Sequence, residues 1–249
     1  MAISPEAASL KARSTPWTER ILNITVSNAS ALPAWWRDAY HSYRMTLDQP
    51  DYPCFFGQAA ERRGEMFYAF DGQHPQVART TMRRFVELGR DASLVRHSLA
   101  MFCAPDPELT SHADFLRRFW SILRRLHDAD EVPMRPADPD DPWWEFSFGG
   151  RKMFVVGTSP TYRKRRSRVI GSGMLLLFQP RELFTDLATG KPISAEVRRQ
   201  IHARMLAYDA MPAHPDIGFY GDPGTREWKQ YCLPDDNAPV TGRCPFASG

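Results

Sequence analysis

Cys54 is the most reactive side chain in a distinctive setting, because it follows Pro53 and precedes Phe55, Phe56 and Gly57. A free cysteine in apolar surroundings is usually a small buried hydrophobic residue. The alternative is a thiolate ligand to haem iron, which needs a dry apolar shell and a small neighbour that lets a flat macrocycle approach. The two phenylalanines and the glycine meet these needs, so this short stretch leaves both roles open.

A basic run at residues 162–168 (Y-R-K-R-R-S-R) carries five positive charges in seven residues. Charge blocks of this kind are usually solvated loops. The alternative is an anion site, because planar guanidinium groups bind carboxylates and phosphates through paired hydrogen bonds. No nucleic-acid-binding motif accompanies the run. We therefore expect no nucleic-acid partner and favour the carboxylates of a bound cofactor as the anion.

Glu145 lies among aromatic residues in the sequence W-W-E-F-S-F, directly after Trp144. A carboxylate in such surroundings must face water, a partner or a ligand. The alternative is plain strand alternation, which would expose Glu145 and bury its aromatic neighbours. A role in ligand binding and a role as an exposed strand residue are both open at this point.

Other metal-binding patterns are weak. The four cysteines show no C-x-x-C spacing and the seven histidines form no H-E-x-x-H motif, which argues against a zinc site. His41, His97 and His127 fall within expected helices or strands and are most simply structural. Cys244, which directly precedes Pro245, remains a further candidate ligand.

The chain has 249 residues, of which 43% are hydrophobic, and a formal net charge of +3. This size supports its own core without disulfide bonds. We expect residues 1–20 to form a flexible leader and residues 21–249 a single domain. Because neither a signal-peptide pattern nor a membrane-spanning segment is evident, we expect a reduced, cytoplasmic protein with no membrane partner. A homodimer is one open alternative for its assembly.

The pattern of apolar residues predicts an α+β fold, in which helices flank a mainly antiparallel sheet and the C-terminal region is rich in loops. The predicted helices cover residues 34–47, 74–88, 114–127, 182–187 and 195–208. The predicted strands cover residues 65–71, 94–104, 143–149, 152–157 and 172–179. Of these, the amphipathic helix at 114–127 has the clearest pattern.

Several motifs occur in order between Tyr52 and Phe246: Y-P-C-F-F-G, F-W-S-I-L-R-R-L-H-D-A-D, P-W-W-E-F-S-F-G-G, S-P-T-Y-R-K-R-R-S-R, L-F-Q-P-R-E-L-F, V-R-R-Q-I-H-A-R-M-L-A-Y-D, I-G-F-Y-G-D-P-G-T-R-E-W-K-Q-Y-C-L-P-D-D-N and C-P-F. Together they resemble the YqcI/YcgG family. The resemblance implies a b-type haem and hydroxylation of a guanidine nitrogen, as in the arginine N-hydroxylation step of D-cycloserine biosynthesis. The oxidant would be O2 or hydrogen peroxide. With O2 an external electron donor is needed, since the chain has no flavin or nicotinamide motif.

With a haem implied, the residues described above suggest a hypothesis for the site. Cys54 would be the iron ligand, with Phe55, Phe56 and Gly57 beside the haem. Arg163, Arg166 and Arg168 would hold the haem propionates, and Glu145 with Trp144 would grip the substrate guanidinium.

Two positions depart from the family pattern. Many members have histidine in place of Tyr162 and cysteine in place of Ser147, so Tyr162 becomes an alternative, tyrosinate ligand. A non-catalytic haem carrier or a redox or gas sensor is the alternative function.

Overall fold

The computed structural model describes residues 17–23, 32–71, 75–185, 194–209 and 211–246. Its strands are β1 (Met66–Asp71), β2 (Ser98–Cys103), β3 (Ser147–Phe148), β4 (Arg151–Thr158) and β5 (Leu175–Pro180). Its α-helices are α2 (Trp36–Leu47), α3 (Phe55–Arg63), α4 (Pro75–Leu88), α5 (His112–Asp128), α6 (Ala195–Asp209) and α7 (Glu227–Tyr231). Short 3-10 helices are η1 (Trp17–Arg20), η3 (Arg166–Arg168) and η4 (Arg181–Phe184).

Within the described part of the chain, the strands form one five-stranded sheet in the order β1-β2-β5-β4-β3. β1 and β2 pair in parallel, and the other three neighbouring pairs are antiparallel. The predicted α+β fold with a mainly antiparallel sheet is therefore confirmed.

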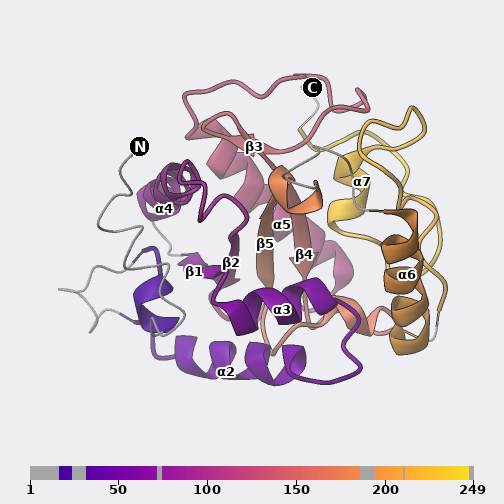
Figure 1. The fold of residues 1–249 in the computed structure, drawn as a ribbon, viewed down its shortest axis with the longest axis horizontal. Coiled ribbons are helices and arrows are strands. Elements are labelled where there is room, and N and C mark those ends of the chain that lie inside the picture. The colour runs from indigo at the N-terminus through magenta and orange to yellow at the C-terminus, as the bar shows by residue number, and fades with distance from the viewer. Residues whose placement is uncertain (1–16, 24–31, 72–74, 186–193, 210, 247–249) are drawn as a thin grey trace.

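The buried side chains form two clusters, one on each face of the sheet. Alternation along β2 sends Leu99 and Met101 into the cluster with α4 and α5, and Ala100 and Phe102 into the cluster with α2. Figure 1 shows α3 in front of the lower part of the sheet, α2 below α3, and α5 behind β4 and β5. The sheet thus separates two distinct apolar layers, and this decides which candidate residues can act together.

Helix α5 confirms the clearest sequence prediction. Its apolar stripe is buried, and Ser111 and Asp114 form a capping box at its N-terminus. The Ser111 side chain accepts from the Asp114 backbone N–H, and the Asp114 carboxylate accepts from the Ser111 backbone N–H at 2.9 Å. This reciprocal pairing satisfies two backbone donors that have no partner inside the helix.

Two helices, α3 and α7, are not predicted by the pattern of apolar residues, because both are short and have weak periodicity. α3 begins directly after Cys54 and ends at Gly64, whose φ of 72° is in the left-handed region that glycine tolerates. α7 lies in the C-terminal segment that is otherwise loop, as expected. Both helices carry candidate site residues.

The strand at 143–149 was predicted too long. Only Ser147 and Phe148 pair with β4, across a hairpin in which Gly149 and Gly150 both have positive φ. Before Ser147 the chain makes other contacts: the Trp144 ring and the Phe146 backbone N–H contact Tyr231 of α7, and Glu145 pairs with Arg181 of η4. The strand at 94–104 is also shorter, since residues before Ser98 form turns.

The N-terminal part is described from Trp17, where η1 precedes a bridge between Ile21 and Tyr68. Residues 1–16 of the expected leader lie outside the described residues. Among the described helices, none combines the length and apolar character that crossing a membrane requires.

Candidate functional site

Cys54 occupies the N-cap position of α3, where its sulfur accepts a hydrogen bond from the backbone N–H of Gly57 at 3.4 Å. Burial raises the pKa of the Cys54 thiol, while the amides of Gly57 and Phe56 and the charges of Arg204 and Arg168 oppose that rise. Amides and cations that favour a thiolate suit a metal ligand, because a cysteine must lose its proton to bind iron.

A mostly apolar cavity of about 50 Å³ adjoins Cys54. Tyr43 and Leu47 of α2, and Leu177 and Gln179 of β5, contribute to its walls. Gly57 also lines it, and a Cβ at that position would lie 3.4 Å from the Cys54 sulfur. The glycine therefore keeps the space beside the thiol open.

Beyond the cavity, the same side of β4 and β5 is only partly covered. Phe154 lies opposite Gln179 and Val156 opposite Leu177 in the antiparallel register, so the four side chains share one face. All four are partly buried. We call these four residues the β4–β5 face; three of them are apolar and one carries an amide, and Leu177 and Gln179 line the cavity beside Cys54.

The structure brings part of the basic run close to Cys54. Arg168 is buried, and its guanidinium donates to the backbone oxygens of Gly157, Tyr231 and Gln230. Arg166 is exposed, with its guanidinium 4.8 Å from the centre of the Tyr208 ring on α6. These contacts make Arg168 a structural cation near the thiol and leave Arg166 at the surface.

Arg204 of α6 is a neighbour of Cys54 that the sequence pattern does not predict. It donates to the backbone oxygen of Tyr52 at 2.6 Å and lies 6.0 Å from the Phe55 ring. Its charge also acts on the Cys54 thiol. Because Arg204 is far from Cys54 in the chain, no sequence motif or spacing indicates this contact.

The anion that the basic run holds in this structure is a carboxylate of the chain itself. Asp235 accepts hydrogen bonds from the backbone N–H groups of Arg163, Lys164 and Arg165, each at 2.8 Å. These amides lower the pKa of Asp235, against the opposing effect of burial. The Arg163 side chain is exposed. The loop conformation therefore depends on Asp235.

Replacing Asp235 with alanine is expected to lower the free energy of unfolding by about 1–2 kcal/mol, because three amides lose a charged acceptor in a partly exposed site. Urea denaturation at pH 7 measures this. Asp222, whose side chain is exposed, provides the control: Asp222→Ala should change stability by less than about 0.5 kcal/mol. Equal effects in the two variants would contradict the role given to Asp235.

Tyr162, the alternative ligand, lies on the opposite side of the sheet from Cys54. It is buried in the cluster with α5, its hydroxyl donates to the Leu233 backbone oxygen at 2.8 Å, and burial raises its pKa. Cys244 is buried in the same cluster. No histidine lines the cavity beside Cys54. Cys54 and Tyr162 are therefore alternatives that belong to different layers of the fold.

Glu145 is buried and pairs with a guanidinium of the same chain. Arg181, the first residue of η4, donates through Nε to Glu145 Oε2 at 2.9 Å and through Nη2 to Glu145 Oε1. Burial raises the pKa of Glu145, and Arg181 opposes that rise. Trp144 is fully buried against Tyr231 and Phe246. The predicted ligand carboxylate thus already holds a guanidinium, in the bidentate geometry expected of such a pair.

A second buried carboxylate, Glu227 of α7, lies beside this pair. Its Oε1 is 3.3 Å from Arg181 Nη2, and burial raises its pKa to about 7, with Arg181 opposing and Glu145 reinforcing the rise. The Arg181 guanidinium also lies 4.0 Å from the ring centre of Tyr220 and 5.4 Å from that of Phe184. Two carboxylates and two aromatic rings thus surround one guanidinium.

The raised pKa of Glu227 predicts a pH-dependent stability. Its folded-state value of about 7 exceeds its usual 4.5, so ionisation costs about 3 kcal/mol more in the folded state. The contribution of Glu227 to the free energy of unfolding is therefore fully present below pH 4.5, where the carboxyl group is protonated, and is lost as the pH rises to about 7.

Urea denaturation of wild type and Glu227→Gln at pH 5 and pH 8 measures this contribution. We expect the difference in unfolding free energy between the two proteins to shift by about 2–3 kcal/mol in favour of the variant at pH 8. A difference that is the same at both pH values would show that Glu227 does not titrate in this range.

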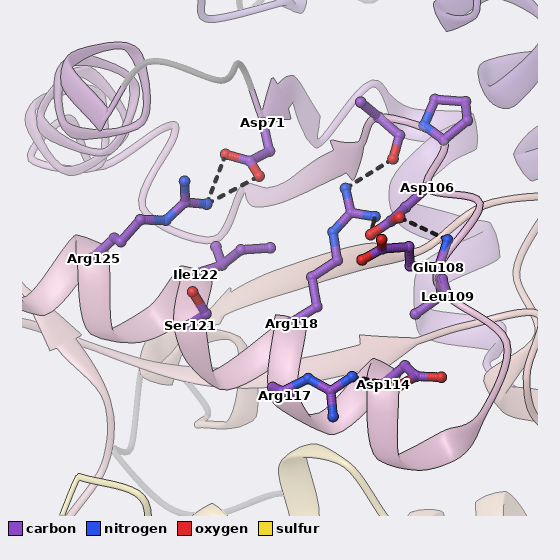
Figure 2. A pocket seen from close by; sticks show the side chains of 12 residues that line it. Asp71, Asp106, Glu108, Leu109, Asp114, Arg117, Arg118, Ser121, Ile122 and Arg125 are labelled. Carbon is purple, nitrogen blue, oxygen red and sulfur yellow. Dashed lines mark hydrogen bonds and ion pairs between the residues drawn. The ribbon is translucent and has the colours of Figure 1, made fainter.

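A second cleft, of about 580 Å³, lies elsewhere, beside α5 and the ends of β1 and β2. Figure 2 shows its charged side chains directed at one another: Arg125 pairs with Asp71 at 3.1 Å and Arg118 with Asp106 at 2.8 Å. None of the predicted site residues lines this cleft. Because its charges are matched internally, its size alone does not make it the functional site.

η4 connects the two parts of the candidate site. Its Leu183 lines the Cys54 cavity, its Phe184 ring lies 5.9 Å from Phe154, and its Arg181 holds Glu145. Arg181 and Glu227 both fall in motifs quoted above, L-F-Q-P-R-E-L-F and G-T-R-E-W. The motifs therefore include both residues, but nothing in their spacing along the chain predicts that they contact Glu145.

Comparison with known proteins agrees with these motifs. The model of the YqcI/YcgG family matches residues 43–247. The YcgG protein of Bacillus subtilis (strain 168) is 34% identical over 87% of this chain and 89% of its own length, and YqcI of the same organism is 32% identical over 86% and 89%. No solved structure matches the chain significantly.

A third relative carries a functional name. It is "Putative N(omega)-hydroxy-L-arginine synthase DcsA" from Streptomyces lavendulae, 30% identical over 86% of this chain and 85% of its own length. The motifs, the family match and these relatives agree, and the chain belongs to the YqcI/YcgG family.

Proposed function

We propose that this chain is a haem-dependent N-hydroxylase of a guanidine-containing substrate such as L-arginine. The observation that carries the proposal is the similarity, over most of both chains, to the relative named as an N(omega)-hydroxy-L-arginine synthase. The site supports it with a thiol at a helix N-cap, an adjoining apolar face and a buried carboxylate pair that already holds a guanidinium.

The residues present fit a haem in their chemistry. Cys54 would supply a thiolate, the β4–β5 face would contact the macrocycle, and Arg166 and Arg204 would provide positive charge for the propionates. The enclosed cavity of about 50 Å³ is smaller than the ~300–1,000 Å³ of typical ligand pockets. A macrocycle therefore requires the partly exposed surface beyond the cavity.

No three His, Cys, Asp or Glu side chains gather to hold a metal ion among the described residues. Haem needs only one protein ligand, since the macrocycle supplies four nitrogens. When bound, it would supply activated oxygen, and thiolate ligation favours cleavage of the O–O bond. The protein would provide the ligand, exclude water and orient the substrate.

The proposed reaction replaces a guanidine N–H bond with N–OH. With hydrogen peroxide, one oxygen atom enters the product and the other leaves as water. With O2, an external donor supplies two electrons and solvent supplies two protons, and the second oxygen again leaves as water. Buried carboxylates beside Arg181 would position the substrate guanidinium for this step.

The test is turnover. Haem-loaded protein, L-arginine and either hydrogen peroxide or O2 with a reductase should give hydroxyarginine, detected by mass spectrometry as substrate plus one oxygen atom. Protein without haem is the control. If the loaded protein binds haem but forms no N-hydroxylated product from L-arginine or related guanidines, the chain is a carrier or sensor instead.

A further inference from the structure

Two buried polar groups of α7 lack partners. Glu227 is 4% exposed and its Oε2 has no hydrogen-bond partner among the described residues; Gln230 is 5% exposed and its Nε2 also has none. Three residues apart on a helix, they lie on neighbouring parts of one face. A buried polar atom without a partner costs free energy, so two on one face indicate a missing ligand or water.

Arg181 pairs with only one of the two oxygens of Glu227 and leaves Oε2 without a partner in the described part of the chain. It is committed to Glu145 through two hydrogen bonds, and its contact with Glu227 is a single one at 3.3 Å to Oε1. When both carboxylates are ionised, the three groups sum to one negative charge. A further monocation that donates N–H groups would balance the charge and pair with Oε2.

The cluster lies just below the surface and beside the β4–β5 face. The side chain of Arg181 is 21% exposed, while that of Glu227 is 3% exposed. Tyr220 and Phe184 flank the Arg181 guanidinium, and Phe184 contacts Phe154 of the β4–β5 face. A ligand at Glu227 would therefore lie close to the apolar surface that adjoins Cys54.

We propose that Glu227 is the carboxylate that binds the guanidinium of the substrate, through its unpartnered Oε2. The Gln230 amide donates to an acceptor atom of the same molecule, and Arg181, fixed by Glu145, forms the wall of the site. The identity of the ligand as a guanidine rests on the proposed function; the presence of a cation site rests on the two unpartnered groups.

Binding should depend on pH. The titratable and charged groups around Glu227 are Arg181 of η4, Glu145 before β3 and Tyr231 of α7, and Lys152 of β4 acts on Glu145. Burial raises the pKa of Glu227 to about 7, so it is mostly ionised at pH 8 and mostly protonated at pH 6. Affinity for a cation should fall about tenfold between these pH values.

Isothermal titration calorimetry of full-length protein with L-arginine, with and without haem, tests this site. We expect Glu227→Gln to weaken binding more than tenfold at pH 8 and to abolish its pH dependence. L-Citrulline, which lacks the positive charge, should not bind wild type. Glu131→Gln, which removes an exposed charge paired with Arg79 and Arg83, is the matched control and should bind as wild type. Thermal unfolding checks that each variant folds.

If Glu227→Gln binds L-arginine as tightly as wild type and with the same pH dependence, the inference is overturned. Oε2 of Glu227 would then bond to water only. Failure of wild type to bind L-arginine in either form would also overturn it. The proposed function is tested separately: arginine binding that depends on Glu227 without hydroxylation refutes only the function. Hydroxylation with an unchanged KM in Glu227→Gln refutes only this site.

Discussion

Replacing Cys54 with serine is expected to reduce arginine hydroxylation by the haem-loaded protein more than about 100-fold. Loss of a residue that only hydrogen-bonds a metal ligand typically lowers activity by about 10–100-fold, and loss of the ligand itself should cost more. Serine keeps the N-cap and nearly the same volume, so the fold should survive. It cannot supply the thiolate that favours O–O cleavage. Product formation by mass spectrometry and haem affinity by absorbance titration measure the effect.

Tyr162→Phe is the matched control for Cys54→Ser. Tyr162 lies in the other layer of the fold, and its hydroxyl donates to the Leu233 backbone oxygen. The variant should keep its activity and lose about 1 kcal/mol of stability from the missing hydrogen bond. Loss of haem in Tyr162→Phe with retention in Cys54→Ser would make Tyr162 the ligand and reverse the assignment.

Replacing Arg181 with methionine is expected to lower the free energy of unfolding by about 3–5 kcal/mol at pH 8, since it leaves two buried carboxylates without their shared cation. The loss should be smaller at pH 5, where Glu227 is protonated. Urea denaturation at both pH values measures it.

An exposed ion pair provides the control for Arg181. Arg63 pairs with Glu65 at 2.6 Å, with side chains 50% and 31% exposed, so Arg63→Met should cost less than about 1 kcal/mol. Adding Glu145→Gln to Arg181→Met should restore part of the loss, because one unpaired charge is removed. Equal costs in the two arginine variants would show that the buried cluster is not stabilised by Arg181.

The fold was predictable where side-chain periodicity is strong. The helix around Phe119 has a full apolar stripe, and the β4 and β5 segments carry enough apolar residues to be recognised. α3 and α7 were missed because they are short and their burial comes from tertiary contacts. The strand expected over residues 143–149 forms only at Ser147 and Phe148, and Glu145 pairs instead with Arg181, a contact that the local pattern does not encode.

Several residues of the candidate site could be predicted from the sequence, but the contacts between them could not. Sequence pattern and family resemblance marked Cys54, Glu145 and the basic run. Only the fold revealed that Asp235 holds the run and that Arg204 approaches Cys54. Glu227 lies 82 residues after Glu145 in the chain, so only long-range packing brings the two carboxylates together at Arg181.

The absorption spectrum of haem-loaded protein, reduced and exposed to carbon monoxide, tests the central claim most directly. We predict the long-wavelength Soret band typical of thiolate-ligated haem in wild type and in Tyr162→Phe, and its loss in Cys54→Ser. A wild-type spectrum typical of histidine or tyrosinate ligation would contradict Cys54 as the ligand. The absence of any Soret band after reconstitution would contradict haem-dependent chemistry in this protein.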